Sequence, residues 1–226
     1  MKHNVYVISA GRYNKLPFDN NQKSKYIFCV KKGEKHLYEQ NGCVNVFETG
    51  NLMQSRNFAL EHAYKNKLIC VQLSDDIKKV VVNKNFGEPV NVKLDFAIND
   101  IIEKFNKVKG IKLLGIPPTD NFFFAKSIIS KNTFCIGDML FVKPTELRFD
   151  EQLTLKEDYD YTLQHKERFG CVRYQKYLFT FQHYTNDGGA VDVRNDAEEQ
   201  KNIRILKSKW GDKVRLNPKR KNEILI

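Results

Sequence analysis

Two adjacent carboxylates, Asp75 and Asp76, directly follow an apolar run at residues 68–73. A continuous run of Leu, Ile and Val predicts a strand that is buried on both faces, as in parallel sheets. Open α/β sheets bind ligands in the crevice beyond the carboxyl ends of their strands. Mg²⁺ and Mn²⁺ favour oxygen ligands, often one or two carboxylates together with substrate phosphates. The pair therefore predicts a metal or ligand site; the alternative is a plain strand-to-turn junction, where Asp is common.

The first apolar segment of the chain ends in Ser9, Ala10, Gly11 and Arg12. Small residues at a strand end let backbone amides approach a ligand closely, and Arg12 adds a positive charge. We expect this turn to contribute to the same ligand site.

Arg56 falls inside the apolar stripe of a helix predicted over residues 51–66. A guanidinium on a buried face needs an anionic partner, because an unpaired buried charge is costly. One solution is an ion pair with Asp75 or Asp76. The other is a role in holding a nucleotide or its phosphates, for which the guanidinium fork is suited.

A second acidic pair, Glu157 and Asp158, opens a helix predicted over residues 157–168. The helix dipole favours acids in a first turn. The functional alternative is a general base aimed at an acceptor hydroxyl. His183 ends an apolar segment just before a Gly-Gly turn, where it is either structural or a third metal ligand.

The elements that must position these residues alternate between strands and helices. Strands are predicted at residues 5–8, 26–30, 44–47 and 68–73, with helices at 33–40 and 51–66. This order predicts an α/β fold with a mainly parallel central sheet and flanking helices. An amphipathic helix at 94–108 supplies core packing, and strand-like segments follow at 111–116, 122–129, 133–142 and 171–184.

Composition is that of one domain over residues 1–226, with 41% hydrophobic residues to build a core. No apolar run approaches the roughly 20 residues that span a bilayer, and no signal-peptide pattern is present. The five cysteines are odd in number and widely spaced, and Cys29, Cys70 and Cys135 lie in predicted strands. We expect a reduced, cytoplasmic protein with neither a membrane partner nor a cysteine-based metal site.

The net charge of +11 is concentrated at the carboxyl end. Residues 201–226 carry nine Lys and Arg against Asp212 and Glu223, which gives 9 − 2 = +7 and leaves +4 for the first 200 residues. A basic helix and tail over residues 196–226 suggests a polyanionic partner, nucleic acid first. The alternative is a solvated helix in a chain whose Lys and Asn content reflects AT-rich coding sequence.

Taken in order, these motifs resemble the nucleotide-sugar glycosyltransferases of the GT-A fold. Ser74-Asp75-Asp76 corresponds to the family's DxD motif, departing from it at the first position, where Asp is usual. Asp76 matches the metal-binding last Asp, Glu157-Asp158 resembles the xED motif, whose Asp is the base in inverting members, and His183 matches a metal-ligand His. The resemblance covers roughly residues 4–190.

Within that family the chain is most similar to the small phage glycosyltransferases that modify hydroxymethylated DNA bases, related to those associated with TET/JBP-type dioxygenases. The resemblance implies Mn²⁺ or Mg²⁺ held by Asp76, with Asp75 and His183, a UDP-sugar donor (glucose or a pentose such as arabinose) and a host-cytoplasmic location. Asp158 would be the base beside Glu157, while Arg12 and Arg56 would hold the nucleotide with Ser9, Ala10, Gly11 and Asp75. DNA phosphates would meet the basic side chains of the carboxyl end: Lys207, Lys209, Lys213, Arg215, Lys219, Arg220 and Lys221.

Three other functions remain open at this point. The sugar could go to a glycan, lipid or protein. The chain could be a nucleic-acid-binding module with a degenerate site, for which the substituted Ser74 gives some support. It could also be a nucleotidyltransferase, which uses the same arrangement of Asp after a strand.

Overall fold

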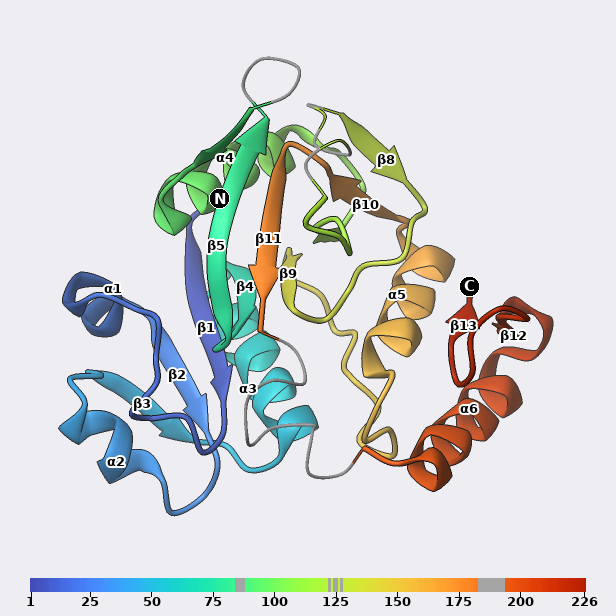
Figure 1. Ribbon diagram of the computed structural model, residues 1–226, viewed down its shortest axis with the longest axis horizontal. Helices are drawn as coiled ribbons and strands as arrows, with labels where there is room; N and C mark the ends of the chain where they lie inside the picture. Colours follow the sequence, from blue (N-terminus) through green and yellow to red (C-terminus); the bar gives the residue numbers. More distant parts are fainter. Residues whose placement is uncertain (84–87, 122, 124–125, 127, 183–193) are drawn as a thin grey trace.

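The computed structural model describes residues 1–83, 88–121, 123, 126, 128–182 and 194–226. Its main sheet, within this described part, has eight strands in the order β3-β2-β1-β4-β9-β7-β10-β8 (Figure 1). These strands are β1 His3–Ser9, β2 Ile27–Val30, β3 Asn45–Glu48, β4 Ile69–Ser74, β7 Leu113–Gly115, β8 Ile129–Lys131, β9 Met139–Val142 and β10 Cys171–Tyr174.

The sheet is mostly parallel, as the sequence predicts. β3, β2, β1 and β4 pair in parallel, and so do β7 and β10. Two strands run the other way: β9 lies antiparallel between β4 and β7, and β8 is antiparallel to β10. The α/β class is therefore confirmed, with a mixed rather than purely parallel second half.

Helices cover both faces of this sheet. They are α1 Asn20–Lys25, α2 Lys35–Gln40, α3 Leu52–Lys65, α4 Leu94–Lys107, α5 Glu157–Arg168 and α6 Asp196–Trp210. Successive side chains of β1 pack against different helix layers, because successive strand residues point to opposite faces of the sheet. Val5 and Val7 pack in a core shared with α4, whereas Tyr6 packs in a second core shared with α3 and α5.

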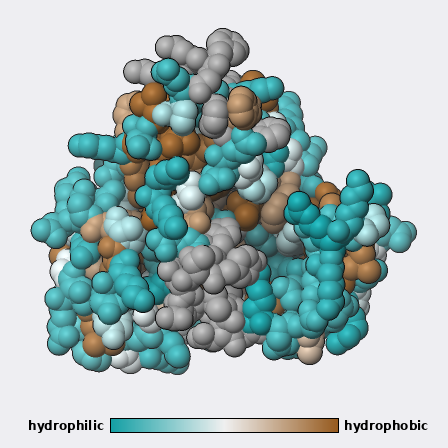
Figure 2. Space-filling model, viewed as in Figure 1, coloured by the Kyte–Doolittle hydropathy of each residue, from teal (hydrophilic) through white to brown (hydrophobic). Residues whose placement is uncertain are grey.

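A second, three-stranded sheet leaves the main one where β4 ends. Its order is β11-β5-β6, with β5 at Ile77–Asn83, β6 at Pro89–Asn91 and β11 at Tyr177–Phe181. Hydrophobic side chains show over β5 and β11 on a face that is otherwise mainly hydrophilic (Figure 2). Asp75 and Asp76 form the two-residue connection between β4 and β5, so they are held at the junction of the two sheets.

Some predicted boundaries are wrong. The strand expected at residues 171–184 is two strands in different sheets, β10 and β11, separated by a turn at Gln175 and Lys176. Only β9 forms within the strand expected at 133–142, so Cys135 lies in a loop. The end of the segment predicted at 122–129 forms the start of β8, and residues 122, 124, 125 and 127 lie outside the described part.

The basic carboxyl end is a helix followed by a hairpin. α6 leads through a 3₁₀ turn, Gly211–Lys213, to strands β12 Arg215–Leu216 and β13 Ile224–Leu225. A separate small core joins α6 and the hairpin to α5 through Leu163, Ile203 and Leu206. Asp160, fully buried on α5, accepts hydrogen bonds from Trp210 Nε1 (2.7 Å) and Lys209 Nζ (3.1 Å) and so fixes the end of α6.

All five cysteines are buried free thiols. None of the helices in the described part of the chain has the length and apolar character that a membrane crossing requires.

Candidate functional site

The carboxyl ends of β1 and β4 lie at the point where the strand order reverses. From β1 the chain builds outward through β2 to β3, and then returns to place β4 on the other side of β1. Ligands in open α/β sheets bind at such a switch point. Ser9 ends β1 and Ser74 ends β4, with Ile8 opposite Ser74 in the register.

Asp75 is held at this point by partners from the end of β1. The carboxylate is 3% exposed, accepts a hydrogen bond from Ser9 Oγ and forms an ion pair with Arg12. Because Ser9 donates to Asp75, the buried Tyr38 hydroxyl, 2.6 Å from Ser9 Oγ, donates to Ser9 in turn. Burial raises the pKa of Asp75, and Arg12 and Ser9 oppose that rise.

The turn before Arg12 contains a glycine, Gly11, in a backbone conformation that favours glycine. Gly11 has a φ of +70°, in the left-handed region, and its amide donates to Glu34 Oε2 at 2.9 Å. Ala10 precedes it and is half-buried. Ser9, Ala10, Gly11 and Arg12 are thus gathered beside Asp75.

Asp76 is less engaged than Asp75. Its Oδ1 accepts a hydrogen bond from Ser74 Oγ at 2.7 Å, and its main-chain carbonyl accepts one from Gln182 at 3.0 Å. The other carboxylate oxygen receives no hydrogen bond from the described residues. Asp76 is buried, with 9% of its surface exposed, so its carboxylate lies at the switch point with only a small accessible area.

One backbone segment joins this acid pair to the second one. The Ser74 amide donates to the carbonyl of Asp138 at 2.8 Å, and the neighbouring Gly137 amide donates to Asp158 Oδ2 at 2.9 Å. Asp138 and Gly137 precede β9, which pairs with β4. The end of β4 and the start of α5 are therefore connected through two consecutive residues.

Arg56 pairs with Glu157, and not with Asp75 or Asp76 as the ion-pair interpretation of the sequence expected. Its Nη2 lies 3.2 Å from Glu157 Oε1 and 3.0 Å from the carbonyl of Gly137. The side chain lies over the ring of Phe149, with the guanidinium carbon 5.2 Å from the ring centroid. The distant partner follows from the packing of α3 and α5 on the same face of the sheet.

Asp158 has the pKa that proton transfer near neutral pH requires. Its side chain is half-buried at the start of α5, and burial raises its pKa to about 7, with the neighbouring charge of Glu157 as the second cause. The Asp138 carboxylate acts in the same direction, while the Gly137 amide and the Arg56 guanidinium favour the charged form. Glu157 is neutralised by Arg56, so Asp158 is the better candidate for a base.

Four residues of the site were not predicted from the sequence: Tyr38, Gln72, Gly137 and Asp138. Tyr38 supports Ser9, and Gln72 anchors Arg56 with an Oε1–Nη1 distance of 3.0 Å. Gln72 carried a signal, because it is the one polar residue within the otherwise apolar run at residues 68–73; the structure buries it fully. Gly137 and Asp138 carried no such signal, because a Gly-Asp pair is common where a loop leads into an apolar strand.

The described residues contain no group of three or more His, Cys, Asp and Glu side chains placed to hold a metal ion. His183, predicted as a ligand, lies outside the described residues. Asp75 is already neutralised by Arg12. Asp76 therefore fits a Mg²⁺ or Mn²⁺ ion best, as one protein carboxylate among phosphate and water ligands.

The predicted DNA-binding residues divide into two groups. Lys209, Lys213, Arg220 and Lys221 form ion pairs with acids of the chain itself. The others are exposed and have no acidic partner within the described ranges: Lys207, Arg215 and Lys219. Intramolecular pairing thus reduces the positive charge that a polyanion would meet.

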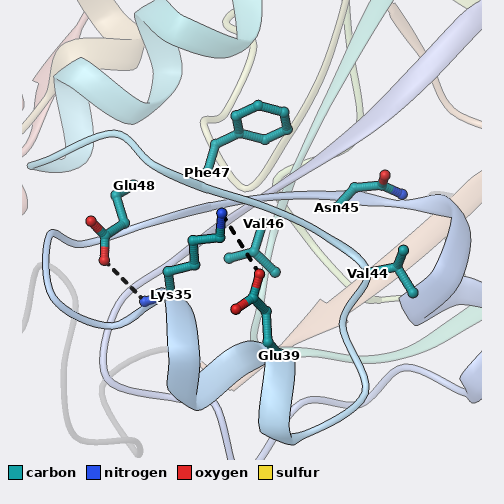
Figure 3. A pocket seen from close by; sticks show the side chains of 7 residues that line it. All are labelled: Lys35, Glu39, Val44, Asn45, Val46, Phe47 and Glu48. Atoms are coloured by element: carbon teal, nitrogen blue, oxygen red, sulfur yellow. Dashed lines mark hydrogen bonds and ion pairs between the residues drawn. The ribbon is translucent and has the colours of Figure 1, made fainter.

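A surface hollow of about 410 Å³ lies along the edge strand β3 and helix α2 (Figure 3). Its carboxylates are occupied: Glu48 Oε1 accepts from the Lys35 amide at 3.2 Å, and Glu39 pairs with Lys35 Nζ. It contains none of the predicted site residues; its lining is Lys35, Glu39, Val44, Asn45, Val46, Phe47 and Glu48.

No protein-family model matches the sequence, and comparison with curated proteins gives no match either.

Gly137 tests whether the two acid pairs depend on this close packing. A Cβ at this position would lie 2.8 Å from Arg56 Nη2, so Gly137→Ala forces the guanidinium or the loop to move. We expect a loss of about 1–3 kcal/mol in the free energy of unfolding, measured by urea denaturation. In an Arg56→Met background the loss should shrink by about 1 kcal/mol, because the clash is removed.

Gly110→Ala is the matched control. Its added Cβ would meet nothing within 4 Å, so its cost comes from its φ of +76° and should be the same in both backgrounds. Equal costs for Gly137→Ala with and without Arg56 would contradict the packing described above.

Proposed function

We propose that the chain is a metal-dependent, inverting glycosyltransferase that transfers a sugar from a UDP-sugar to hydroxymethylcytosine, or to a sugar already attached to it, in phage DNA. The proposal combines the motif resemblance with the placement of these motifs. The single observation that carries it is the link from the end of β4 through Asp138 and Gly137 to Asp158. A donor site and a base adjoin each other there.

The base is supported by its surroundings. A carboxylate with a pKa of about 7 is half ionised at neutral pH, which suits general acid–base catalysis. Asp158 takes the proton of the acceptor hydroxyl as that oxygen forms a bond to the anomeric carbon. The bond from this carbon to the donor phosphate breaks on the opposite face, and the nucleoside diphosphate leaves. A single displacement of this kind inverts the stereocentre.

The donor side is formed by the end of β1 and the β4–β5 connection. Arg12 is half-buried beside Asp75, where its positive charge can meet a diphosphate. Asp76 would hold Mg²⁺ or Mn²⁺, which when bound neutralises charge on the leaving diphosphate. Arg56, predicted as a nucleotide ligand, is buried and engaged with Glu157 instead.

A second candidate keeps the sugar transfer and changes the acceptor to a glycan, lipid or protein. The observation that favours it is the pairing of Lys209, Lys213, Arg220 and Lys221 with acids of the same chain. Surface pairs of this kind are weak and can exchange for phosphates. DNA therefore remains the first proposal.

The direct test is mass spectrometry of nucleosides from hydroxymethylated DNA incubated with the protein, Mn²⁺ and a panel of nucleotide sugars. We expect a mass increase of one sugar on hydroxymethylcytosine. Asp158→Asn should lower the rate by about 10²–10⁴-fold, because the base is lost. Glu103→Gln, a change at an exposed carboxylate on α4 that pairs with Lys107, is the matched control. Absence of transfer or donor hydrolysis with every sugar would overturn the proposal.

The pH dependence follows from the same group. Asp158 must be ionised to accept a proton, and its pKa is raised to about 7. Below this pH kcat should fall by about tenfold per unit, and above it kcat should level off. Initial rates at saturating donor between pH 5 and 9 measure this directly. A rate that is flat down to pH 5 would exclude Asp158 as the base.

DNA binding should rest on the three predicted DNA-binding residues that have no acidic partner within the described ranges. Replacing Lys207, Arg215 and Lys219 with Gln should weaken binding to duplex DNA and reduce the slope of log affinity against log salt by about 1 for each lost phosphate contact. Fluorescence anisotropy over a range of NaCl concentrations gives both values. The matched triple variant at Lys2, Lys25 and Lys67, which lie elsewhere on the surface, should leave the slope unchanged. Equal effects of the two triples would argue against a defined DNA surface.

A further inference from the structure

Protein groups occupy both terminal nitrogens of the Arg56 guanidinium, whereas its buried Nε has no hydrogen-bond partner among the described residues. The residue is 7% exposed, Nη1 donates to Gln72 Oε1 at 3.0 Å, and Nη2 donates to the Gly137 carbonyl at 3.0 Å. Nη2 also lies 3.2 Å from Glu157. One face of the guanidinium lies over the ring of Phe149. A nucleotide would have to displace these partners to reach it.

The side chain is also fixed at its base. Gln72 is fully buried in β4, and its Nε2 donates back to the main-chain carbonyl of Arg56 at 2.9 Å. The amide of Gln72 therefore holds both the backbone and the guanidinium of Arg56. A reciprocal pair of this kind leaves a long side chain little rotational freedom, which is what precise positioning of a third group requires.

Four parts of the fold meet around the guanidinium of Arg56. α3 contributes Arg56, β4 contributes Gln72, the loop before β9 contributes Gly137, and α5 contributes Glu157. Gly137 is bound on both sides: its carbonyl accepts from Arg56 and its amide donates to Asp158 Oδ2. Arg56 thus binds the same residue whose amide binds Asp158.

We propose that Arg56 is a positioning residue of the acid site, and not a nucleotide ligand: it holds Glu157 and the Gly137 carbonyl so that the Gly137 amide reaches Asp158. The assignment of Asp158 as a base rests on the proposed function, whereas the positioning itself does not. Removing Arg56 should disturb Asp158 and leave the nucleotide site at Arg12 intact.

The test compares variants that change the charge around Asp158 in opposite directions. The charged groups that act on Asp158 are Glu157, Asp138 and Arg56, and two backbone amides donate to it: Gly137 to Oδ2, and Tyr159 to Oδ1 at 3.0 Å. Arg56→Gln removes a positive charge, so the carboxyl carbon of Asp158, followed by ¹³C NMR and assigned with Asp158→Asn, should titrate at higher pH than in the unmodified protein. Glu157→Gln removes a negative charge and should move the titration to lower pH.

UDP affinity, measured by calorimetry with Mn²⁺, separates positioning from nucleotide binding. Arg56→Gln should leave the Kd for UDP within about twofold and lower kcat by about 100-fold, as a misplaced catalytic group does. Arg12→Gln should show the reverse pattern, with a raised Kd for UDP and an unmoved titration of Asp158. Arg56→Lys, which keeps the positive charge without the fork, should move the titration less than Arg56→Gln.

Each outcome bears on one proposal. A Kd for UDP raised by about tenfold in Arg56→Gln, with the Asp158 titration unchanged, would overturn positioning and restore the nucleotide role. If Arg56→Gln does not fold, Arg56→Lys and Glu157→Gln still decide, since an unmoved titration in both would overturn positioning. If the unmodified protein transfers no sugar, the proposed function fails, while the titration shifts still test Arg56.

Discussion

The site depends on the hydrogen bond between the Ser74 amide at the end of β4 and the carbonyl of Asp138. This bond extends the β4–β9 pairing by one step beyond the strands themselves, and it fixes the loop that carries Gly137. From there one amide reaches Asp158 and one carbonyl reaches Arg56. A backbone segment can serve both neighbours only because it lacks a side chain: a Cβ on Gly137 would lie within 3.4 Å of atoms of Arg56, Asp158 and Glu157.

Charge balance explains why the two acid pairs differ internally. Each pair has one carboxylate neutralised by a buried or half-buried arginine, Asp75 by Arg12 and Glu157 by Arg56. The second member of each pair, Asp76 or Asp158, has no cationic side chain paired with it within the described ranges. Adjacent carboxylates repel, so this division lowers the cost of burying both and leaves one acid per pair for a cation or a proton. Within the described residues, the same combination of one paired and one unpaired acid occurs after the end of β4 and at the start of α5, which are distant in sequence.

Local patterns predicted the elements that are regular and failed where the chain changes sheets. The stripe of α4, the limits of α5 and the apolar run of β4 are each visible in short windows of sequence. β5 was not predicted, because Asp75 and Asp76 read as the start of a loop although the next residue already begins a strand of the second sheet. The same change of sheet splits the segment at 171–184, where Lys176 turns away to pair with Asp100 of α4. Such partners depend on tertiary packing, which a local window does not contain.

In the candidate site, the sequence likewise predicted that a residue needs a partner but not which partner it finds. Composition was enough to say that Arg56 needs an anion, since an arginine inside an apolar helical stripe has few other solutions. Which anion it finds depends on α5, about 100 positions later in the chain, being packed on the same sheet face as α3. The choice has a chemical consequence. Had Arg56 paired with Asp76, the switch point would hold two neutralised carboxylates and no ligand for a cation, while Glu157 beside Asp158 would stay uncompensated and raise the pKa of Asp158 further. The observed pairing leaves Asp76 and Asp158 without a paired cationic side chain among the described residues, which is the condition that the proposed metal site and the proposed base both require.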